Sequence, residues 1–198
     1  METKKIVLSL AIVCMAMFVH AQKDSVIKKG MIRAHANLSG GYLFAPKKMA
    51  SYISGNLEYY INENFSIVGE VWCSFDIAQP NEIGLKRNFL GFAGLNYHPV
   101  KKSRWDPYIG FSAGVGLITI NQFQDTLIRE SPIQLTPLVG VAAGLNYYVG
   151  SIFHFFFQCK FVAGGTNTSQ YGRVYLEELK FSGGLGWNLT PKKKRNDR

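Results

Sequence analysis

The feature that most constrains this chain is a repeated alternation of apolar with small or polar residues, with a period of two. From Gly30 onward the alternation fills segments of about 11–16 residues, separated by clusters of Asn, Asp, Gly, Lys, Ser and Pro. In segment 65–76 one face carries Phe65, Ile67, Val71, Cys73 and Phe75, and the other carries Ser66, Glu70, Ser74 and Asp76. A period of two is that of a β-strand, so the chain is predicted to be all-β.

Eight such segments are predicted to be strands. They lie at about 30–43, 50–61, 65–77, 88–98, 107–120, 133–148, 152–163 and 174–189. Tight turns are predicted at 62–64 and 149–151, and a longer connection at 99–106 lies on the same side. The remaining connections, near 44–49, 78–87, 121–132 and 164–173, are predicted to be polar loops on the opposite side.

Composition helps to decide whether the apolar face of the strands points outward to lipid or inward to the core of a soluble barrel. The chain is 47% hydrophobic, yet its mean hydropathy of +0.01 is too low for a bundle of membrane helices. A soluble barrel would turn its polar face to water and carry many outward Lys, Glu and Thr. Here the polar face is sparse and rich in Ser, Asn, Gln and Gly, as in a crowded interior. The prediction is an eight-stranded antiparallel up-and-down transmembrane β-barrel, closed because an open edge in lipid leaves backbone groups unpaired.

Charged residues within the strands support this orientation. The alternation places six of them on the polar face, as candidates for an ion-pair network inside the barrel: Arg33, Glu58, Glu70, Lys160, Glu178 and Lys180. On the lipid face a midplane Lys or Arg would cost about 2–4 kcal/mol. Glu177 has the opposite parity, so we expect it near the outer rim or in a bulge.

A weak internal repeat predicts a belt of aromatic residues. The run 93–97, Ala-Gly-Leu-Asn-Tyr, recurs at 143–147, and 184–188 is a looser copy. Aromatic side chains at one depth on alternate strands are typical of a membrane interface. The predicted interface aromatics are Tyr59, Tyr97, Tyr147 and Trp187.

The N-terminus is predicted to be a secretory signal peptide, residues 1–21. Lys4 and Lys5 precede an apolar run at 6–19 that closes on Val-His-Ala at 19–21. Cleavage leaves one domain, 22–198, with the barrel at about 30–189 and a basic tail at 190–198. The net charge then falls from +9 to +8.

Several runs resemble the outer membrane protein beta-barrel domain family of small porin-like barrels. They are residues 55–70, 107–116 and 140–147, and the likeness extends over about 30–189. The resemblance implies residence in the outer membrane of a Gram-negative cell, with periplasmic chaperones and the barrel-assembly machinery as partners during biogenesis. Family members often end in an aromatic residue, whereas this chain continues past Trp187 and Leu189 into its basic tail.

Motifs for chemistry are weak. His35, His98 and His154 fall on different strands without metal-ligand spacing, and Cys73 and Cys159 face lipid by parity. The run 110–114, Gly-Phe-Ser-Ala-Gly, has the spacing of a nucleophile elbow, but it lies mid-strand with Ser112 facing inward. No catalytic residue, cofactor or metal is predicted. The positive charge suits lipid phosphates better than nucleic acid, because no nucleic-acid reader motif is present.

The sequence thus predicts a monomeric, non-enzymatic barrel in contact with outer-membrane lipids. Its expected role is in envelope integrity or surface interaction. The alternatives are a small pore, a lipid-modifying outer-membrane enzyme and a soluble periplasmic barrel that binds an apolar ligand.

Overall fold

The structure of the chain is a computed structural model that describes residues 27–45, 47–75, 84–101, 103–124, 127–168 and 172–189. The predicted signal peptide and the basic tail lie outside these residues. The described residues form nine strands: β1 (Ile32–Leu43), β2 (Lys48–Tyr60), β3 (Phe65–Ser74), β4 (Gly84–Tyr97), β5 (Trp105–Gln124), β6 (Leu127–Glu130), β7 (Gln134–Tyr148), β8 (Phe153–Thr168) and β9 (Gly172–Leu189). In this part of the chain no helix is long and apolar enough to cross a membrane.

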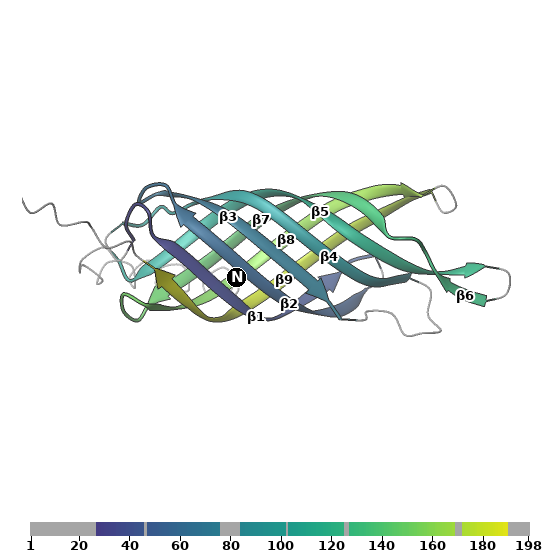
Figure 1. The fold of residues 1–198 in the computed structure, drawn as a ribbon, viewed down its shortest axis with the longest axis horizontal. Coiled ribbons are helices and arrows are strands. Elements are labelled where there is room, and N and C mark those ends of the chain that lie inside the picture. The colour runs from purple at the N-terminus through teal and green to yellow at the C-terminus, as the bar shows by residue number, and fades with distance from the viewer. Residues whose placement is uncertain are drawn as a thin grey trace, which may run out of the picture.

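Eight of the strands close into an antiparallel barrel (Figure 1). Strands β1 to β5 pair in sequence order, and β5 then pairs with β7. Strand β8 lies between β7 and β9, and the pairing of β9 with β1 closes the barrel. The short strand β6 pairs with β5 alone, where the two project beyond the barrel. This closure confirms the predicted fold class.

The two ends of the barrel differ in their connections. At one end, here the turn end, short segments at 61–64, 98–104 and 149–152 join neighbouring strands. The first and last strands also meet there, because Ile32 pairs with Leu189. The opposite end, here the loop end, carries the β5–β6 hairpin (Figure 1).

Two predicted loops at the loop end are wrong, because strands continue through them. In the predicted loop 121–132, β5 runs on to Gln124 and folds back as β6. In the predicted loop 164–173, β8 continues to Thr168 and β9 begins at Gly172. The hydrogen bonds between two strands join backbone groups and do not depend on the side chains. Strand pairing can therefore continue beyond the point where the apolar alternation that marks lipid contact has stopped.

Alternation along the strands separates interior from exterior. Burial in β3 switches at every residue, with Val68 and Trp72 3% and 2% exposed while Ile67 and Val71 are each 49% exposed. The two large apolar residues that broke the sequence pattern therefore point inward. Apolar side chains cover the outside of the barrel wall, as lipid contact requires.

The β1–β9 pair that closes the barrel has an interrupted ladder. Pairing stops after His35↔Gly186 and resumes at Gly40↔Phe181. The side-chain amide of Asn37 lies in this interval and donates to the backbone oxygens of Leu38, at 3.1 Å, and Gly183, at 3.5 Å. The bond to Gly183 thus joins β1 to β9 across a stretch of wall where the backbone ladder is absent.

Glycines permit the close strand approach of the barrel at particular sites, which two substitutions on β4 can test. A Cβ at Gly94 would overlap the Phe111 carbonyl oxygen and lie 2.6 Å from Cβ of Ser112, whereas a Cβ at Gly91 meets nothing within 4 Å. We expect Gly94→Ala to lower the free energy of unfolding by about 1–3 kcal/mol, the usual cost of overpacking. Gly91→Ala is the matched control and is expected to stay near wild type. Urea unfolding in lipid vesicles measures both, and equal losses would contradict this account.

Candidate functional site

The interior of the turn-end half is built around four buried ionisable side chains from four segments. Arg33 on β1 pairs with Glu58 on β2, its direct strand partner, and with Asp106 on β5 at 3.2 Å. Nδ1 of His98, directly after β4, lies 2.7 Å from Asp106, and Nε2 lies 3.1 Å from Glu58, so that both ring nitrogens donate when His98 is protonated. All four are at most 1% exposed. Two cations and two carboxylates balance one another, so this charge cluster carries no net charge when His98 is protonated.

Neutral donors complete the charge cluster. Glu58 also accepts hydrogen bonds from Ser66 and from Asn96, the latter at 2.8 Å. Asp106 accepts from Tyr60, Asn146 and Tyr148 at 3.0–3.2 Å. Buried carboxylates are tolerated when their lone pairs are filled in this way, so the charge cluster fixes the relative positions of the strands around it.

A second ion pair lies further toward the loop end. Lys160 on β8 reaches across the interior to Glu70 on β3. Gln158 donates to the same carboxylate at 2.9 Å, and the Lys160 ammonium lies 3.9 Å from the Phe92 ring centroid. Since β3 and β8 are not neighbours in the sheet, this contact crosses the lumen.

The third pair, Lys180 and Glu178, lies on β9 alone. The two inward residues approach to 2.8 Å, and the ammonium lies 3.3 Å from the Tyr52 ring centroid and 5.0 Å from that of Trp72. The structure thus places all six residues proposed for the internal network inside the barrel, in three pairs. The faces of these aromatic rings stabilise the positive charge of Lys180, where few hydrogen-bond acceptors are in reach.

Two members of the charge cluster, Asp106 and His98, are absent from the predicted internal network. Asp106 falls in the predicted connection 99–106, before a strand expected at 107, and the sequence pattern brings in His98 only as a candidate metal ligand. The alternation could have placed Asp106 inside the barrel, because Asp106 lies an even number of residues from the inward residues Tyr108 and Ser112. For His98 nothing local indicates that two carboxylates from distant segments converge on its ring.

Apolar side chains fill much of the remaining interior, next to buried polar residues such as Asn56, Asn88 and Thr136. Toward the loop end a buried cluster spans most of the strands and comprises Leu43, Ala50, Tyr52, Trp72, Leu90, Phe92, Ile118, Leu138, Val162 and Leu176. At the turn end Ile27 and Met31 pack on Tyr60 and Tyr148, held by backbone hydrogen bonds from Gly30 to Tyr60 and from Tyr60 to Met31. Gly30 adopts φ of 83° there, which glycine allows without strain. Side chains therefore occupy the lumen both above and below the charge cluster.

The four aromatics proposed for the interface lie at the turn end, on the outside of the wall. Tyr59, Tyr97 and Trp187 are 41–47% exposed, and Tyr147 is partly exposed. Tyr97 lies 5.3 Å from Phe65, and Tyr147 lies 4.6 Å from Trp105, between ring centroids. The four positions thus belong to a larger aromatic group around this end.

The residues considered for catalysis or metal binding do not converge. His35, His98 and His154 are buried inside the barrel, and Ser112 is buried on the inner face of β5 with its hydroxyl donating to the Gly140 carbonyl. Cys73 and Cys159 are both free thiols. Within the part of the chain that the structure describes, no group of three or more His, Cys, Asp or Glu side chains is arranged to hold a metal ion.

Solved structures with the same fold are small outer-membrane barrels, while no family model and no curated protein matches the sequence. Neisserial surface protein A superposes with a TM-score of 0.60 at 13% identity, over 79% of this chain and 95% of that one. Ail of Yersinia pestis gives 0.55 at 11% identity, over 81% and 99%. The N-terminal domain of OprF from Pseudomonas aeruginosa gives 0.52 at 17%, over 82% and 100%. The chain therefore has the fold of the small eight-stranded outer-membrane barrels.

The Lys160–Glu70 pair allows a test of the buried charges. Lys160→Met leaves the Glu70 carboxylate without its cation, and we expect a loss of about 3–5 kcal/mol in the free energy of unfolding. Adding Glu70→Gln removes the orphaned charge and should restore most of that loss. Urea unfolding of the single and double variants in vesicles measures the coupling, and additive losses would refute it.

His98 predicts a dependence of stability on pH. Burial lowers the pKa of His98, but its hydrogen bonds to Asp106 and Glu58 and the charges of these carboxylates outweigh burial and raise the pKa above its ordinary value. The folded protein then binds a proton more tightly than the unfolded chain. The contribution of protonated His98 to the free energy of unfolding is fully present below about pH 6.5. It is lost as the pH rises through the raised pKa of the folded state. The free energy of unfolding should fall over that window in the wild type, and a fall of the same size in His98→Gln would contradict the assignment.

Proposed function

We propose that this chain is a non-enzymatic integral protein of the outer membrane, with a closed interior and a role in envelope integrity or in interactions at the loop end. The filled lumen carries the proposal. Three buried ion pairs that join separate strands and an apolar cluster occupy the space through which a pore would have to pass. Eight strands enclose an interior that side chains can fill, in contrast to the wide barrels of porins.

The outer surface supports residence in a membrane. Large apolar residues cover the outside of the wall, with aromatic residues at the turn end, so the lipid phase takes the place that water has around a soluble barrel. The fold neighbours include the outer membrane protein OprG of Pseudomonas aeruginosa, at TM-score 0.55 and 10% identity. In this proposal the signal peptide directs export, chaperones and the barrel-assembly machinery insert the chain, and the turn end faces the periplasm.

The loop end is the part of the described structure best placed to meet a partner outside the cell. The β5–β6 hairpin projects past the barrel rim (Figure 1), and the Lys86–Glu130 ion pair ties its base to β4. Regular pairing through segments expected to be loops gives this end a stiffer surface than polar loops would. A rigid rim suits contact with a surface or with neighbouring envelope components.

The alternatives make different demands on the geometry. An enzyme acting on lipid needs a nucleophile and a base near the lipid-facing rim, whereas His35, His98, His154 and Ser112 all lie inside the barrel. A soluble barrel binding an apolar ligand needs a polar exterior, whereas the exterior here is apolar. A pore requires that the internal ion pairs part.

Permeability in liposomes tests the closed interior. Liposomes containing the folded protein are expected to swell in arabinose no faster than protein-free liposomes, because the ion pairs and the apolar cluster block the lumen. Swelling above that background would establish the pore instead. A change in the mass spectrum of lipid A on overexpression would establish the enzyme.

Location and closure are tested together by fractionation and gel mobility. We expect the protein in the outer-membrane fraction, as a band that shifts only after boiling, because a closed barrel resists detergent until heated. A soluble periplasmic protein without a heat-dependent shift would overturn the proposal.

A further inference from the structure

A pocket opens on the rim of the turn end, between the N-terminal segment before β1, the β2–β3 turn and the connection that follows β4. Its volume is about 400 Å³, which lies in the lower part of the range of small-molecule sites. This rim pocket is lined by Lys29, Asn62, Glu63, Asn64, Phe65 and Lys101. Half of its lining residues are charged, so a polar ligand suits it better than an apolar one.

Hydrogen bonds hold the walls of the rim pocket in place. Oδ1 of Asn62 accepts from the backbone N–H groups of Asn64 and Phe65, at 2.8 and 2.9 Å, which fixes the β2–β3 turn. The backbone N–H of His98 donates to the Asn64 carbonyl at 2.8 Å, and the Asn64 side-chain amide donates to the His98 carbonyl at 2.9 Å. The backbone N–H of Gly30 ties the N-terminal segment to the last residue of β2 at 2.8 Å. The pocket is therefore formed before any ligand binds.

The charged residues of the rim pocket do not neutralise one another. Lys29, Glu63 and Lys101 are exposed, and none of them makes an ion pair or a side-chain hydrogen bond in the part of the chain that the structure describes. Two ammonium groups can bind the oxygens of one phosphate, and a carboxylate beside them favours a primary ammonium. The three side chains together suit a ligand that carries one negative and one positive group.

The rim pocket lies where the lipid headgroups meet the barrel. Phe65 is 46% exposed on the outer wall, and its ring centroid lies 5.3 Å from that of Tyr97, one of the turn-end aromatics. Such aromatic rings mark the membrane interface, and the charged residues of the pocket lie beyond them, outside the strands. In the other direction the outward residues of β3 continue through Ile67 and Gly69 toward the membrane centre. A lipid with its head in the pocket thus lays its acyl chains along the wall into the bilayer.

We propose that the rim pocket binds the headgroup of one phosphatidylethanolamine molecule, with its phosphate between Lys29 and Lys101 and its ammonium on Glu63. The site rests on the proposed function, in which the turn end faces the periplasm, and this places the lipid in the inner leaflet of the outer membrane. Phosphatidylglycerol has the phosphate but no cation for Glu63. Phosphatidylcholine has a cation that cannot donate a hydrogen bond, so only phosphatidylethanolamine of the three makes both contacts in full.

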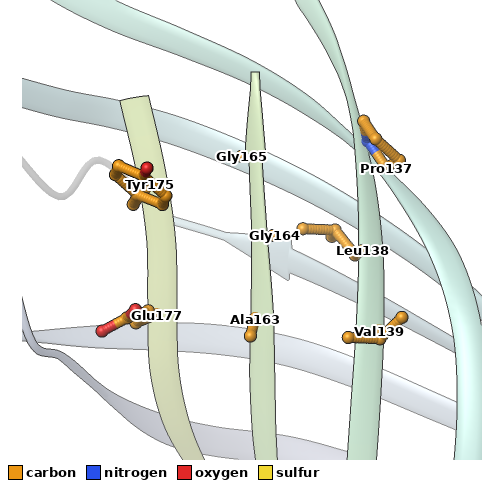
Figure 2. A pocket seen from close by; sticks show the side chains of 8 residues that line it. All are labelled: Pro137, Leu138, Val139, Ala163, Gly164, Gly165, Tyr175 and Glu177. Atoms are coloured by element: carbon orange, nitrogen blue, oxygen red, sulfur yellow. The ribbon is translucent and has the colours of Figure 1, made fainter. Parts of the chain in front are cut away.

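A second hollow, on the outer wall over β7, β8 and β9, has a different chemistry (Figure 2). Its lining contains the carboxylate of Glu177 among apolar and small residues, and it contains no lysine or arginine. A lipid phosphate there would meet a negative charge without a cation to bind it. Glu177 therefore offers a control position, an outward carboxylate outside the rim pocket.

Native mass spectrometry of the barrel released from vesicles tests the site. The vesicles contain equal amounts of phosphatidylethanolamine, phosphatidylglycerol and phosphatidylcholine with the same acyl chains. The wild type is expected to retain one lipid, with phosphatidylethanolamine preferred about two- to fivefold over each of the others, as one exposed ion pair allows. Glu63→Gln should retain a lipid but lose the preference, and Lys29→Gln combined with Lys101→Gln should lose the lipid itself.

Lys28→Gln combined with Arg104→Gln is the matched control for the double variant. Both residues are exposed at the turn end and lie outside the pocket lining, so this variant loses the same charge and should retain lipid like the wild type. Glu177→Gln is the control for Glu63→Gln and should keep the preference. Equal lipid retention in the two double variants, or an unchanged preference in Glu63→Gln, overturns the proposal.

Failure of the site is distinguishable from failure of the proposed function. A heat-dependent gel shift of the wild type and of every variant shows that the barrel is folded and inserted, so loss of lipid with the shift intact concerns the pocket alone. Both leaflets of the vesicles have the same composition, so lipid retention does not depend on which end of the barrel faces outward. A wild type that shows the shift and retains no lipid, or prefers phosphatidylglycerol, overturns the site and leaves the barrel in the membrane.

Discussion

Closure of the backbone ladder is the constraint on which the rest of this structure depends. Lipid offers no hydrogen-bond partners, so each strand must find two neighbours, and the first strand must meet the last. That requirement fixes the antiparallel order and brings Arg33, Glu58 and Asp106 to one level of the lumen. The interrupted β1–β9 ladder, bridged by the Asn37 amide, shows that this constraint is met locally by a side chain where the backbone falls short.

The closed wall then determines what the interior can contain. Once β3 and β8 face each other across a narrow lumen, Lys160 and Glu70 have each other as ionic partners in place of water. The charge cluster near the turn end and the apolar cluster near the loop end fill different parts of the interior, and the Lys180–Glu178 pair lies against Tyr52 and Trp72 of the apolar cluster. The same packing that stabilises the barrel also fills its lumen, so the structural role and the lack of conduction that we propose have one physical origin.

The exterior follows a different rule, because lipid tolerates any apolar surface and selects only at its margins. Most outward positions require no particular neighbour, and the exceptions mark the interfaces. Tyr97 and Trp187 lie at one margin, and Tyr175 and Glu177 lie at the other. Glu177 is exposed in the loop-end half of β9, in agreement with the parity that predicts it on the outside near a rim.

The sequence by itself determined the strand type, the direction in which each side chain points and the sense of the two faces, because these follow from a period of two along one strand. It therefore predicted the barrel and the inward course of Arg33, Lys160 and Lys180. Only the tertiary structure decided which charges meet, that His98 joins Glu58 to Asp106, and that β5 and β8 continue past their apolar segments. These depend on register between strands distant in sequence, and register is set by closure of the whole sheet rather than by any local pattern.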